Sequence, residues 1–446
     1  MSHSAYTLII GLGQTGFACA KFLAQQNLPF RVMDHTLNPP CLTEFQRNFP
    51  NHPMKLGGLD DSWLHQAAEI ILSPGVNPAL PAIAQQIQAK KSVIGDIELF
   101  SRYAKAPIIG ITGSNAKGTV TTLLGEMAKA AGLKVCVGGN IGTPALDLLT
   151  SDPINFYILE LSSFQLELTQ SLKTYAATIL NISPDHLDRH GTLTNYLAAK
   201  QRIYLGTKFA VYNRDDAATK PTVPIPFISS FGSSSPAIGE FGLIKQDEDI
   251  YLSLGREPLL SVRELKIRGS HNWLNALAAL ALGTTMQLPI TAMLATLKEF
   301  PGLSHRCQWI AHHHDVDWYD DSKGTNIGAT LAAITGLSQN LSGKLILIAG
   351  GLGKGADFNL LRPAISAHVK NLILLGQDAL LLDKALHNCC PVTHVTSMQA
   401  AVDAAIRYAA PGDAVLLSPA CASWDMFKDY HHRGQVFTEC VINRRI

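Results

Sequence analysis

Residues 107–122 constrain the fold more than any other stretch of the chain, because they read PIIGITGSNAKGTVTT. The apolar, β-branched run at 108–112 is typical of a buried parallel strand, and a helix-like segment begins near Lys117. The small residues at 113–116 leave backbone N–H groups free to bind an anion. Lys117 adds a full positive charge at the helix N-terminus. The stretch therefore predicts a strand, a loop and a helix that together hold a polyphosphate.

Two positions depart from the usual phosphate-loop pattern. Ala116 stands where a glycine is usual before the lysine, and Gly118 stands where a serine or threonine hydroxyl would reach magnesium. Thr119 is the nearest replacement for that hydroxyl. An ordinary strand-to-helix turn with a surface lysine is the alternative interpretation.

The length and composition predict several domains with much buried sheet. The chain has 446 residues, which at about 150 residues per domain corresponds to three. Only 16% of the residues are charged, against about 25% in typical soluble proteins, and 47% are hydrophobic. The net charge is +1, without a block of like charges, so the pattern favours a small molecule over nucleic acid or an anionic membrane as partner.

The cysteines and the N-terminus indicate the compartment. The eight cysteines are scattered without a C-x-x-C pair, which predicts free thiols in a reducing cytoplasm. The chain enters a strand almost at once, without a signal-peptide pattern, and no apolar run approaches the roughly 18 residues of a membrane span. We expect a cytoplasmic monomer that binds neither nucleic acid nor a membrane.

A second nucleotide-binding pattern lies near the N-terminus. A strand at 7–10 is followed by GLGQTG and a helix-like run, and Asp34 lies 18 residues after Gly16. This spacing suggests a dinucleotide site, but glycines are needed wherever backbone approaches a pyrophosphate, so the nucleotide stays open. A tight turn without a ligand is the alternative. The turn SPGV at 73–76, after another strand, also lies where open α/β sheets bind ligands.

Candidate metal and nucleotide ligands follow the phosphate loop. Glu160 ends a strand at 156–159, where a magnesium-holding acid belongs, unless it is a solvent-exposed acid. His186 or Asp185, in a polar run after the next strand, could bind a metal or a phosphate; a solvated loop is the alternative. In the helix at 271–286, HNWLNALAALALGTTM, two asparagines could cap the helix or bind a base.

The remaining segments complete the predicted organisation. Residues 221–260 suggest a β excursion without evident chemistry, and residues 300–303 suggest a linker. Beyond the linker, alternating strands and helices with glycine- and serine-rich strand ends predict a third α/β domain. Three adjacent histidines at 312–314 suggest a polar hairpin turn, because alternate side chains of an extended segment point to opposite faces.

Ten motifs in order carry a resemblance to a known family: TGSNAKGTVTT, GGNIGTPAL, LELSSFQLE, SPDHLDRH, AAKQRIY, HNWLNALAAL, LSHR, YDDSKGTN, GGLGKGADF and LLSPACASWDMF. They resemble the Mur ligases over nearly the whole chain, and in particular the branch that uses D-glutamate. The resemblance implies an α/β fold with a Rossmann-like UDP-substrate domain at 1–96, a central P-loop ATPase-type parallel sheet binding ATP at 97–301, and a Rossmann-like amino-acid domain at 302–446. It also implies that the third domain closes on the second about a hinge near Gly302.

The activity implied is the ATP-dependent addition of D-glutamate to UDP-N-acetylmuramoyl-L-alanine in peptidoglycan precursor synthesis. Amide formation from a carboxylate is uphill in water, so phosphoryl transfer from ATP first gives an acyl phosphate, which the amine then attacks. Every species on this path is anionic, so cations and oriented donors should carry most of the catalysis.

The resemblance assigns residues by motif. Catalysis is assigned to Lys117, Glu160, His186 and Lys200. ATP binding is assigned to Gly113, Ser114, Asn115, Ala116, Lys117, Gly118, Thr119, Asn272, Asn275, Arg306 and Asp321. Binding of the UDP substrate is assigned to Gln14, Thr15, Asp34, Gly75, Asn140 and Ser162. D-Glutamate binding is assigned to Lys323, Thr325, Lys354 and Ser423. Magnesium binding is assigned to Thr119, Glu160, His186 and Lys200, the last as a CO₂-derived carbamate, because an ammonium would repel Mg²⁺.

Four other interpretations stay open. A folylpolyglutamate synthase would share the central motifs but not a separate GxGxxG domain. A sister Mur ligase adding a diamino acid usually carries Asp-Asn-Pro in the third domain, which is absent here. A nicotinamide-dependent oxidoreductase explains the first domain but leaves the later motifs without a role. A non-catalytic nucleotide sensor has no use for Glu160, His186 and Lys200 together.

Overall fold

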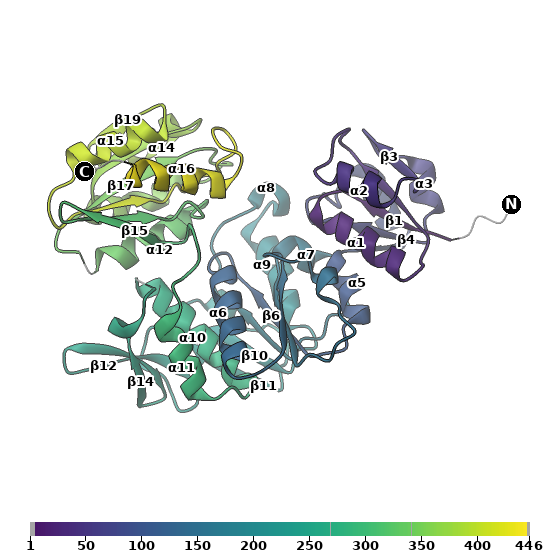
Figure 1. The fold of residues 1–446 in the computed structure, drawn as a ribbon, viewed down its shortest axis with the longest axis horizontal. Coiled ribbons are helices and arrows are strands. Elements are labelled where there is room, and N and C mark those ends of the chain that lie inside the picture. Colours follow the sequence, from purple (N-terminus) through teal and green to yellow (C-terminus); the bar gives the residue numbers. More distant parts are fainter. Residues whose placement is uncertain (1–4, 268, 340, 444–446) are drawn as a thin grey trace.

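The computed structural model describes residues 5–267, 269–339 and 341–443. Three α/β domains follow one another along the chain, each built on its own sheet (Figure 1). The first lies at the upper right of Figure 1, the second below it and the third at the upper left. The predicted fold class is confirmed. Within the described ranges, no helix is long and apolar enough to cross a membrane.

The first domain has a five-stranded parallel sheet in the order β3-β2-β1-β4-β5. Its strands are β1 Thr7–Ile10, β2 Phe30–Asp34, β3 Met54–Leu56, β4 Glu69–Leu72 and β5 Ser92–Ile94. Its helices are α1 Gln14–Gln25, α2 Leu42–Asn48, α3 Asp61–Gln66 and α4 Pro81–Gln88. Strand β1 lies at the centre, so the GLGQTG turn opens at the carboxyl edge of the sheet.

The second domain has a nine-stranded sheet in the order β14-β13-β12-β11-β10-β9-β6-β8-β7. Its strands are β6 Ile108–Thr112, β7 Val135–Gly139, β8 Phe156–Glu160, β9 Ala176–Ile179, β10 Phe209–Asn213, β11 Phe227–Phe231, β12 Phe241–Gln246, β13 Asp249–Leu254 and β14 Glu257–Ser261. Strands β7 to β12 pair in parallel, whereas β12, β13 and β14 pair antiparallel. The β excursion predicted at 221–260 therefore extends the central sheet.

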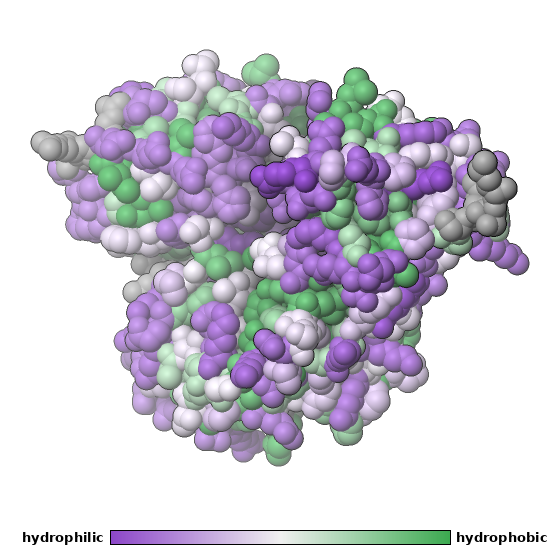
Figure 2. Space-filling view, turned by 45° about the vertical axis from the view of Figure 1, so that its right-hand side comes forward, coloured by the Kyte–Doolittle hydropathy of each residue, from purple (hydrophilic) through white to green (hydrophobic). Residues whose placement is uncertain are grey.

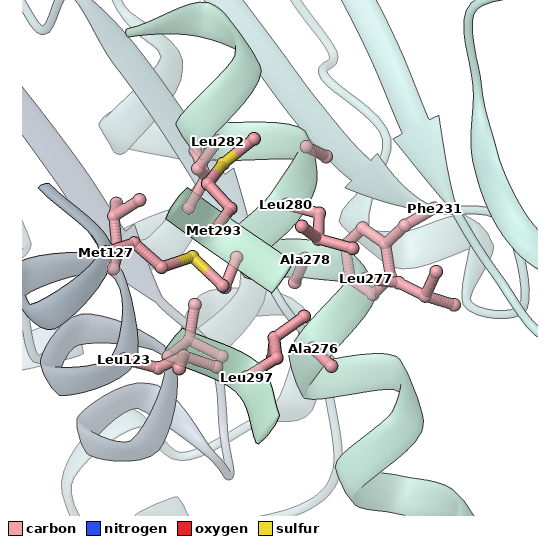
Figure 3. Packing of buried hydrophobic residues seen from close by; sticks show 14 of the residues in the cluster. Leu123, Met127, Phe231, Ala276, Leu277, Ala278, Leu280, Leu282, Met293 and Leu297 are labelled. Atoms are coloured by element: carbon pink, nitrogen blue, oxygen red, sulfur yellow. The ribbon is translucent and has the colours of Figure 1, made fainter. Parts of the chain in front are cut away.

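Helices on both sides of this sheet complete the domain. They are α5 Asp96–Tyr103, α6 Lys117–Ala130, α7 Ser163–Glu167, α8 Leu187–His190, α9 Leu193–Gln201, α10 Ser270–Thr285 and α11 Ile290–Glu299, with short 3-10 turns η1 Ala145–Leu148, η2 Arg202–Tyr204, η3 Ala217–Thr219 and η4 Val262–Glu264. Leu123 of α6, Leu277 of α10 and Leu297 of α11 meet in one buried cluster (Figure 3). This packing fixes the start of α6, which carries the phosphate loop.

The third domain has a six-stranded sheet in the order β15-β16-β20-β17-β18-β19, parallel except for the β15–β16 hairpin. Its elements are β15 Gln308–His313, β16 Val316–Asp320, α12 Ile327–Ser338, β17 Leu345–Gly350, η5 Phe358–Leu361, α13 Arg362–His368, β18 Val369–Leu375, α14 Ala379–Leu386, β19 Val392–His394, α15 Met398–Tyr408, β20 Ala414–Leu417 and α16 Tyr430–Ile442. The hairpin predicted around 312–314 is confirmed: its turn lies at His314 and Asp315, both with left-handed backbone.

The first two domains share buried contacts through α5. Ile97 and Phe100 of this helix lie in one apolar cluster with Phe22 of the first domain and Tyr157 of the second. The predicted boundary after residue 96 falls at the start of this helix, and the boundary after residue 301 falls in the loop between α11 and β15. Both boundaries stay predictions.

The face shown in Figure 2 is largely polar on its upper lobes and is hollowed between them.

Candidate active site

Two cavities meet at the phosphate loop, and residues of the second and third domains line both. The first cavity has a volume of about 280 Å³ and is lined by residues that include Asn115, Ala116, Thr119, Asn181, Asn213, Phe231, His271, Asn272, Asn275, Arg306, Cys307, Asp321 and Lys323. The second cavity, of about 250 Å³, is lined by residues that include Ser114, Asn115, Ala116, Lys117, Asn140, Glu160, Asp185, His186, Arg306, Lys323, Thr325, Lys354, Ser423, Trp424 and Tyr430. Most of the predicted ATP, magnesium and D-glutamate ligands are thus brought together.

The phosphate loop is held by the segment that follows β9. The backbone N–H of Asn115 donates to Asn181 Oδ1 at 2.8 Å, and Ser114 Oγ donates to the Ser183 carbonyl at 3.0 Å. Lys117 Nζ donates to the carbonyls of Gly113 and Ser114, at 2.9 and 3.0 Å, and burial lowers its pKa. The loop therefore carries its cation folded back against its own backbone, next to the N-terminus of α6.

Glu160 is a buried carboxylate, and one of its two oxygens has no hydrogen-bond partner in the described chain. It ends β8 and is 4% exposed, and its Oε1 accepts a hydrogen bond from Asn140 Nδ2 at 2.7 Å. Its Oε2 is buried and has no hydrogen-bond partner in the described chain. An ionised oxygen in this state is unfavourable unless a cation or donor compensates it. Glu160 therefore fits a divalent cation that also contacts a bound phosphate.

His186 and Asp185 also line the second cavity. His186 has left-handed backbone, with a φ of 53°, at the start of α8. Burial and the nearby lysines lower its pKa, which keeps the imidazole neutral at neutral pH. Asp185 Oδ2 accepts a hydrogen bond from Asn326 Nδ2 of the third domain at 3.1 Å. Across the described residues, no three His, Cys, Asp or Glu side chains converge as a ready-made metal site.

Lys200 lies beneath the phosphate loop. It is 1% exposed, and its Nζ donates to the Gly113 carbonyl at 2.9 Å and to Thr112 Oγ1 at 3.3 Å. No carboxylate of the described chain forms an ion pair with it, and burial places its pKa well below the ordinary lysine value. Burial thus favours the uncharged amine of Lys200 over its ammonium form. Lys200 is not among the residues that line either cavity.

The third domain supplies cations and hydroxyls to the second cavity. Lys323 Nζ lies 3.8 Å from the ring centre of Tyr430, and Lys354 Nζ lies 5.1 Å from that of Trp424. Burial, with Arg306 and Lys117 nearby, lowers the pKa of Lys323 to about 8. Tyr430 and Trp424 were not predicted: Trp424 directly follows Ser423 in a quoted motif, whereas Tyr430 lies in no motif.

The first cavity has an amide-rich wall on α10. Asn275 Nδ2 donates to Asn272 Oδ1 at 2.9 Å, and the residue that caps α10 is Gly269, so neither asparagine serves as the cap. Burial raises the pKa of Asp321 to about 7, although its Oδ2 accepts a hydrogen bond from Ser418 Oγ at 2.7 Å. Phe231, an apolar residue at the end of β11, also lines this cavity, and no local sequence pattern indicates that role.

The residues predicted for the UDP substrate are divided between two domains. Gln14 and Thr15 begin α1, and Gly75 lies in the exposed turn after β4. Asp34 closes the GLGQTG turn, because its Oδ2 accepts from the Leu12 N–H at 2.7 Å. Ser162 caps α7 in the central domain, with its Oγ accepting from the Gln165 N–H at 3.2 Å.

The strain in the phosphate loop gives a testable prediction. Ala116 has a φ of 65°, a left-handed conformation that costs a non-glycine residue about 1–2 kcal/mol. Ala116→Gly should relieve this cost, offset by about 0.4–1 kcal/mol of added freedom in the unfolded chain. We expect a net gain in unfolding free energy of up to about 1 kcal/mol, measured by denaturant unfolding.

Ala130→Gly is the matched control, because Ala130 is an exposed residue at the end of the same helix. It should lower the unfolding free energy by about 0.5 kcal/mol or more. Equal losses in the two variants would contradict the strain at Ala116.

Comparison with known proteins identifies the family. Residues 5–95 match the family model "Mur ligase MurD-like, N-terminal domain", residues 111–283 match "Mur ligase middle domain", and residues 305–421 match "Mur ligase, glutamate ligase domain". A protein of Pseudomonas savastanoi pv. phaseolicola named UDP-N-acetylmuramoylalanine--D-glutamate ligase is 51% identical over 98% of this chain and 97% of its own. A protein of the same name from Legionella pneumophila (strain Paris) is 49% identical over 99% of both chains.

Solved structures share the fold at low identity. The UDP-N-acetylmuramate-alanine ligase of Thermotoga maritima has a TM-score of 0.61 at 18% identity, covering 99% of this chain and 100% of its own. A pseudomurein peptide ligase type C of Methanothermus fervidus has a TM-score of 0.63, also at 18% identity, covering 98% and 99%. The family matches and the full-length relatives together show that the chain belongs to the Mur ligase family.

Proposed function

We propose that this protein is an ATP-dependent ligase that joins D-glutamate to UDP-N-acetylmuramoyl-L-alanine in the synthesis of peptidoglycan precursors. Full-length relatives at about 50% identity carry the name of this activity. The observation that carries the proposal is the second cavity, where a phosphate loop and Glu160 face two lysines and two hydroxyl residues of the third domain. We also propose that it acts as a cytoplasmic monomer.

The phosphate loop supports the first half of the reaction. Its backbone amides and the N-terminus of α6 would hold the phosphates of ATP, with Lys117 turning from the loop carbonyls toward the transferred group. The adenosine would occupy the first cavity, beside Asn272, Asn275 and Asp321. The substrate carboxylate attacks the γ-phosphorus, the bond to ADP breaks, and an acyl phosphate forms.

Glu160 and His186 would hold magnesium beside the phosphates, with Asn140 orienting the Glu160 carboxylate. The bound cation would neutralise charge on the transferred phosphoryl group. Arg306, between the two cavities, adds a cation from the third domain. These groups stabilise the anionic transition state without taking or giving a proton.

The third domain supports the second half of the reaction. A dicarboxylic amino acid suits two lysines and two hydroxyls, and we assign its carboxylates to Lys323, Thr325, Lys354 and Ser423. Its free amine attacks the acyl phosphate carbon, an amide bond forms, and phosphate leaves from the tetrahedral intermediate. The proton that the amine loses in this step passes to the departing phosphate.

The first domain would bind the uridine diphosphate end of the other substrate. Gln14 and Thr15 place side chains at the N-terminus of α1, where a pyrophosphate is favoured. We assign Asp34 and Gly75 to the same end, and Asn140 and Ser162 of the central domain to the end near the reacting carboxylate.

The enzymatic proposal is tested by phosphate release from ATP with magnesium and UDP-N-acetylmuramoyl-L-alanine. D-Glutamate, L-lysine, diaminopimelate and no amino acid are compared in parallel. We expect release only with D-glutamate, together with a new UDP-linked product. Release with a diamino acid instead would assign the chain to a sister ligase, and NAD(H) binding without release would overturn the proposal.

The Lys323 ammonium predicts a pH dependence. Its pKa is lowered to about 8, so the charged form is present below this pH and is lost above it. Because only the ammonium attracts a carboxylate, kcat/KM for D-glutamate should fall as the pH rises above about 8. Lys323→Arg keeps its charge and should move this decline to higher pH. An unchanged alkaline decline in that variant would contradict the role of Lys323.

We further propose that Lys200 carries a carbamate. Its buried amine, in the uncharged form that burial favours, can attack CO₂, forming an N–C bond and releasing one proton to solvent. With isotope-labelled bicarbonate, the wild-type protein should show a carbamate carbon signal by NMR that Lys200→Arg lacks. A wild-type spectrum without this signal would refute the modification.

A further inference from the structure

The side chain missing at Gly118 would point directly at the candidate metal ligand. An ideal Cβ built on Gly118 would lie 3.1 Å from Glu160 Oε2 and 2.9 Å from an Arg306 Nη atom. That Glu160 oxygen is the one that is buried without a hydrogen-bond partner. Arg306 and Glu160 flank this point from two domains. Position 118 therefore faces the space where a cation would compensate Glu160.

Thr119 faces a different space. Successive residues of an α-helix are rotated by about 100°, so adjacent positions near the start of α6 cannot present side chains to the same point. Thr119 is buried and lines the first cavity with Asn272 and Asp321, whereas Glu160 lines the second. Thr119 therefore lies at the wall of the first cavity, whereas position 118 faces Glu160.

We propose that the phosphate loop of this protein gives magnesium no side-chain oxygen, and that Gly118 leaves open the coordination position that a loop hydroxyl commonly fills. The inference rests on the proposed function, because it takes Glu160 as a magnesium ligand. Mg²⁺ readily keeps water in such a position, so the site works with a water there but binds the cation more weakly. This replaces Thr119 as the candidate loop ligand.

A serine can be built at position 118. The closest atoms to its Cβ are Ile141 Cδ1, at 2.7 Å, and the Arg306 Nη atom. Both are the far ends of flexible side chains, which can move by a few tenths of an ångström at low cost. The residue lies in the first turn of α6, where serine is well tolerated. Gly118→Ser therefore adds one hydroxyl beside Glu160 Oε2.

The experiment measures Mn²⁺ binding to the full-length protein by electron paramagnetic resonance, in the presence of a non-hydrolysable ATP analogue. Gly118→Ser is compared with Gly118→Ala, which adds the same Cβ without the hydroxyl. We expect Gly118→Ser to bind Mn²⁺ several-fold more tightly than both Gly118→Ala and wild type. Equal affinities in the two variants would overturn the proposal, because the hydroxyl would then not reach the cation.

Two variants of Thr119 form the second arm of the Mn²⁺-binding experiment. Thr119→Val removes its hydroxyl and Thr119→Ser keeps it, so the two variants should bind Mn²⁺ with equal affinity. Weaker binding by Thr119→Val alone would identify Thr119 as the loop ligand and overturn the proposal. If Thr119→Val fails to fold, the two Gly118 variants still decide the question.

The outcomes separate this inference from the proposed function. Mn²⁺ binding is measured without D-glutamate or the UDP substrate, so amino-acid specificity does not enter. A wild-type protein inactive with D-glutamate, combined with tighter Mn²⁺ binding by Gly118→Ser, would overturn only the proposed activity. An active wild type, combined with equal binding by the two Gly118 variants, would overturn only the role of Gly118.

Discussion

Parallel strands end at the same edge of a sheet, and β6 lies between β8 and β9 in the central sheet. This order places the phosphate loop after β6, Glu160 at the end of β8 and the segment 181–186 after β9 beside one another. Asn181 then holds the loop backbone through the Asn115 N–H, and Asn140 holds Glu160. The anion-binding amides and the buried carboxylate are thus fixed before any ligand binds, which is what electrostatic stabilisation requires.

The third domain completes the site through close contacts with small and polar residues. Asn326 caps α12 through its Oδ1 and donates from Nδ2 to Asn115 Oδ1 and to Asp185 Oδ2, each at 3.1 Å. A Cβ on Gly328 would lie 2.5 Å from Ser183 Oγ, so only glycine lets α12 approach this closely. Arg306 and Lys323 consequently reach both cavities. The groups that would bind ATP and those that would bind the amino acid are joined in one site because these domains touch.

The fold and its strand-end motifs could be predicted from the sequence, because buried parallel strands have a strong local pattern. The phosphate loop, the GLGQTG turn and the third α/β domain all follow this rule. Contacts set by tertiary packing could not be predicted. Residues 221–260 join the central sheet, and Phe231 lines the first cavity. Asn326 closes the motif YDDSKGTN, but nothing in the motif indicates that its side chain bridges two domains. The directions in which positions 118 and 119 point depend on the first residue of α6. Sequence spacing predicts that residue only to within one or two positions.

The central claim is that carboxylate activation by ATP and attack by the amino acid occur in one shared site, through an acyl phosphate. The most direct measurement is the fate of oxygen-18 placed in the reacting carboxylate of UDP-N-acetylmuramoyl-L-alanine. Our account predicts one labelled oxygen in the inorganic phosphate released for each amide bond formed, because the acyl phosphate keeps the bridging oxygen when it is cleaved at carbon. Unlabelled phosphate accompanying amide formation would contradict the account.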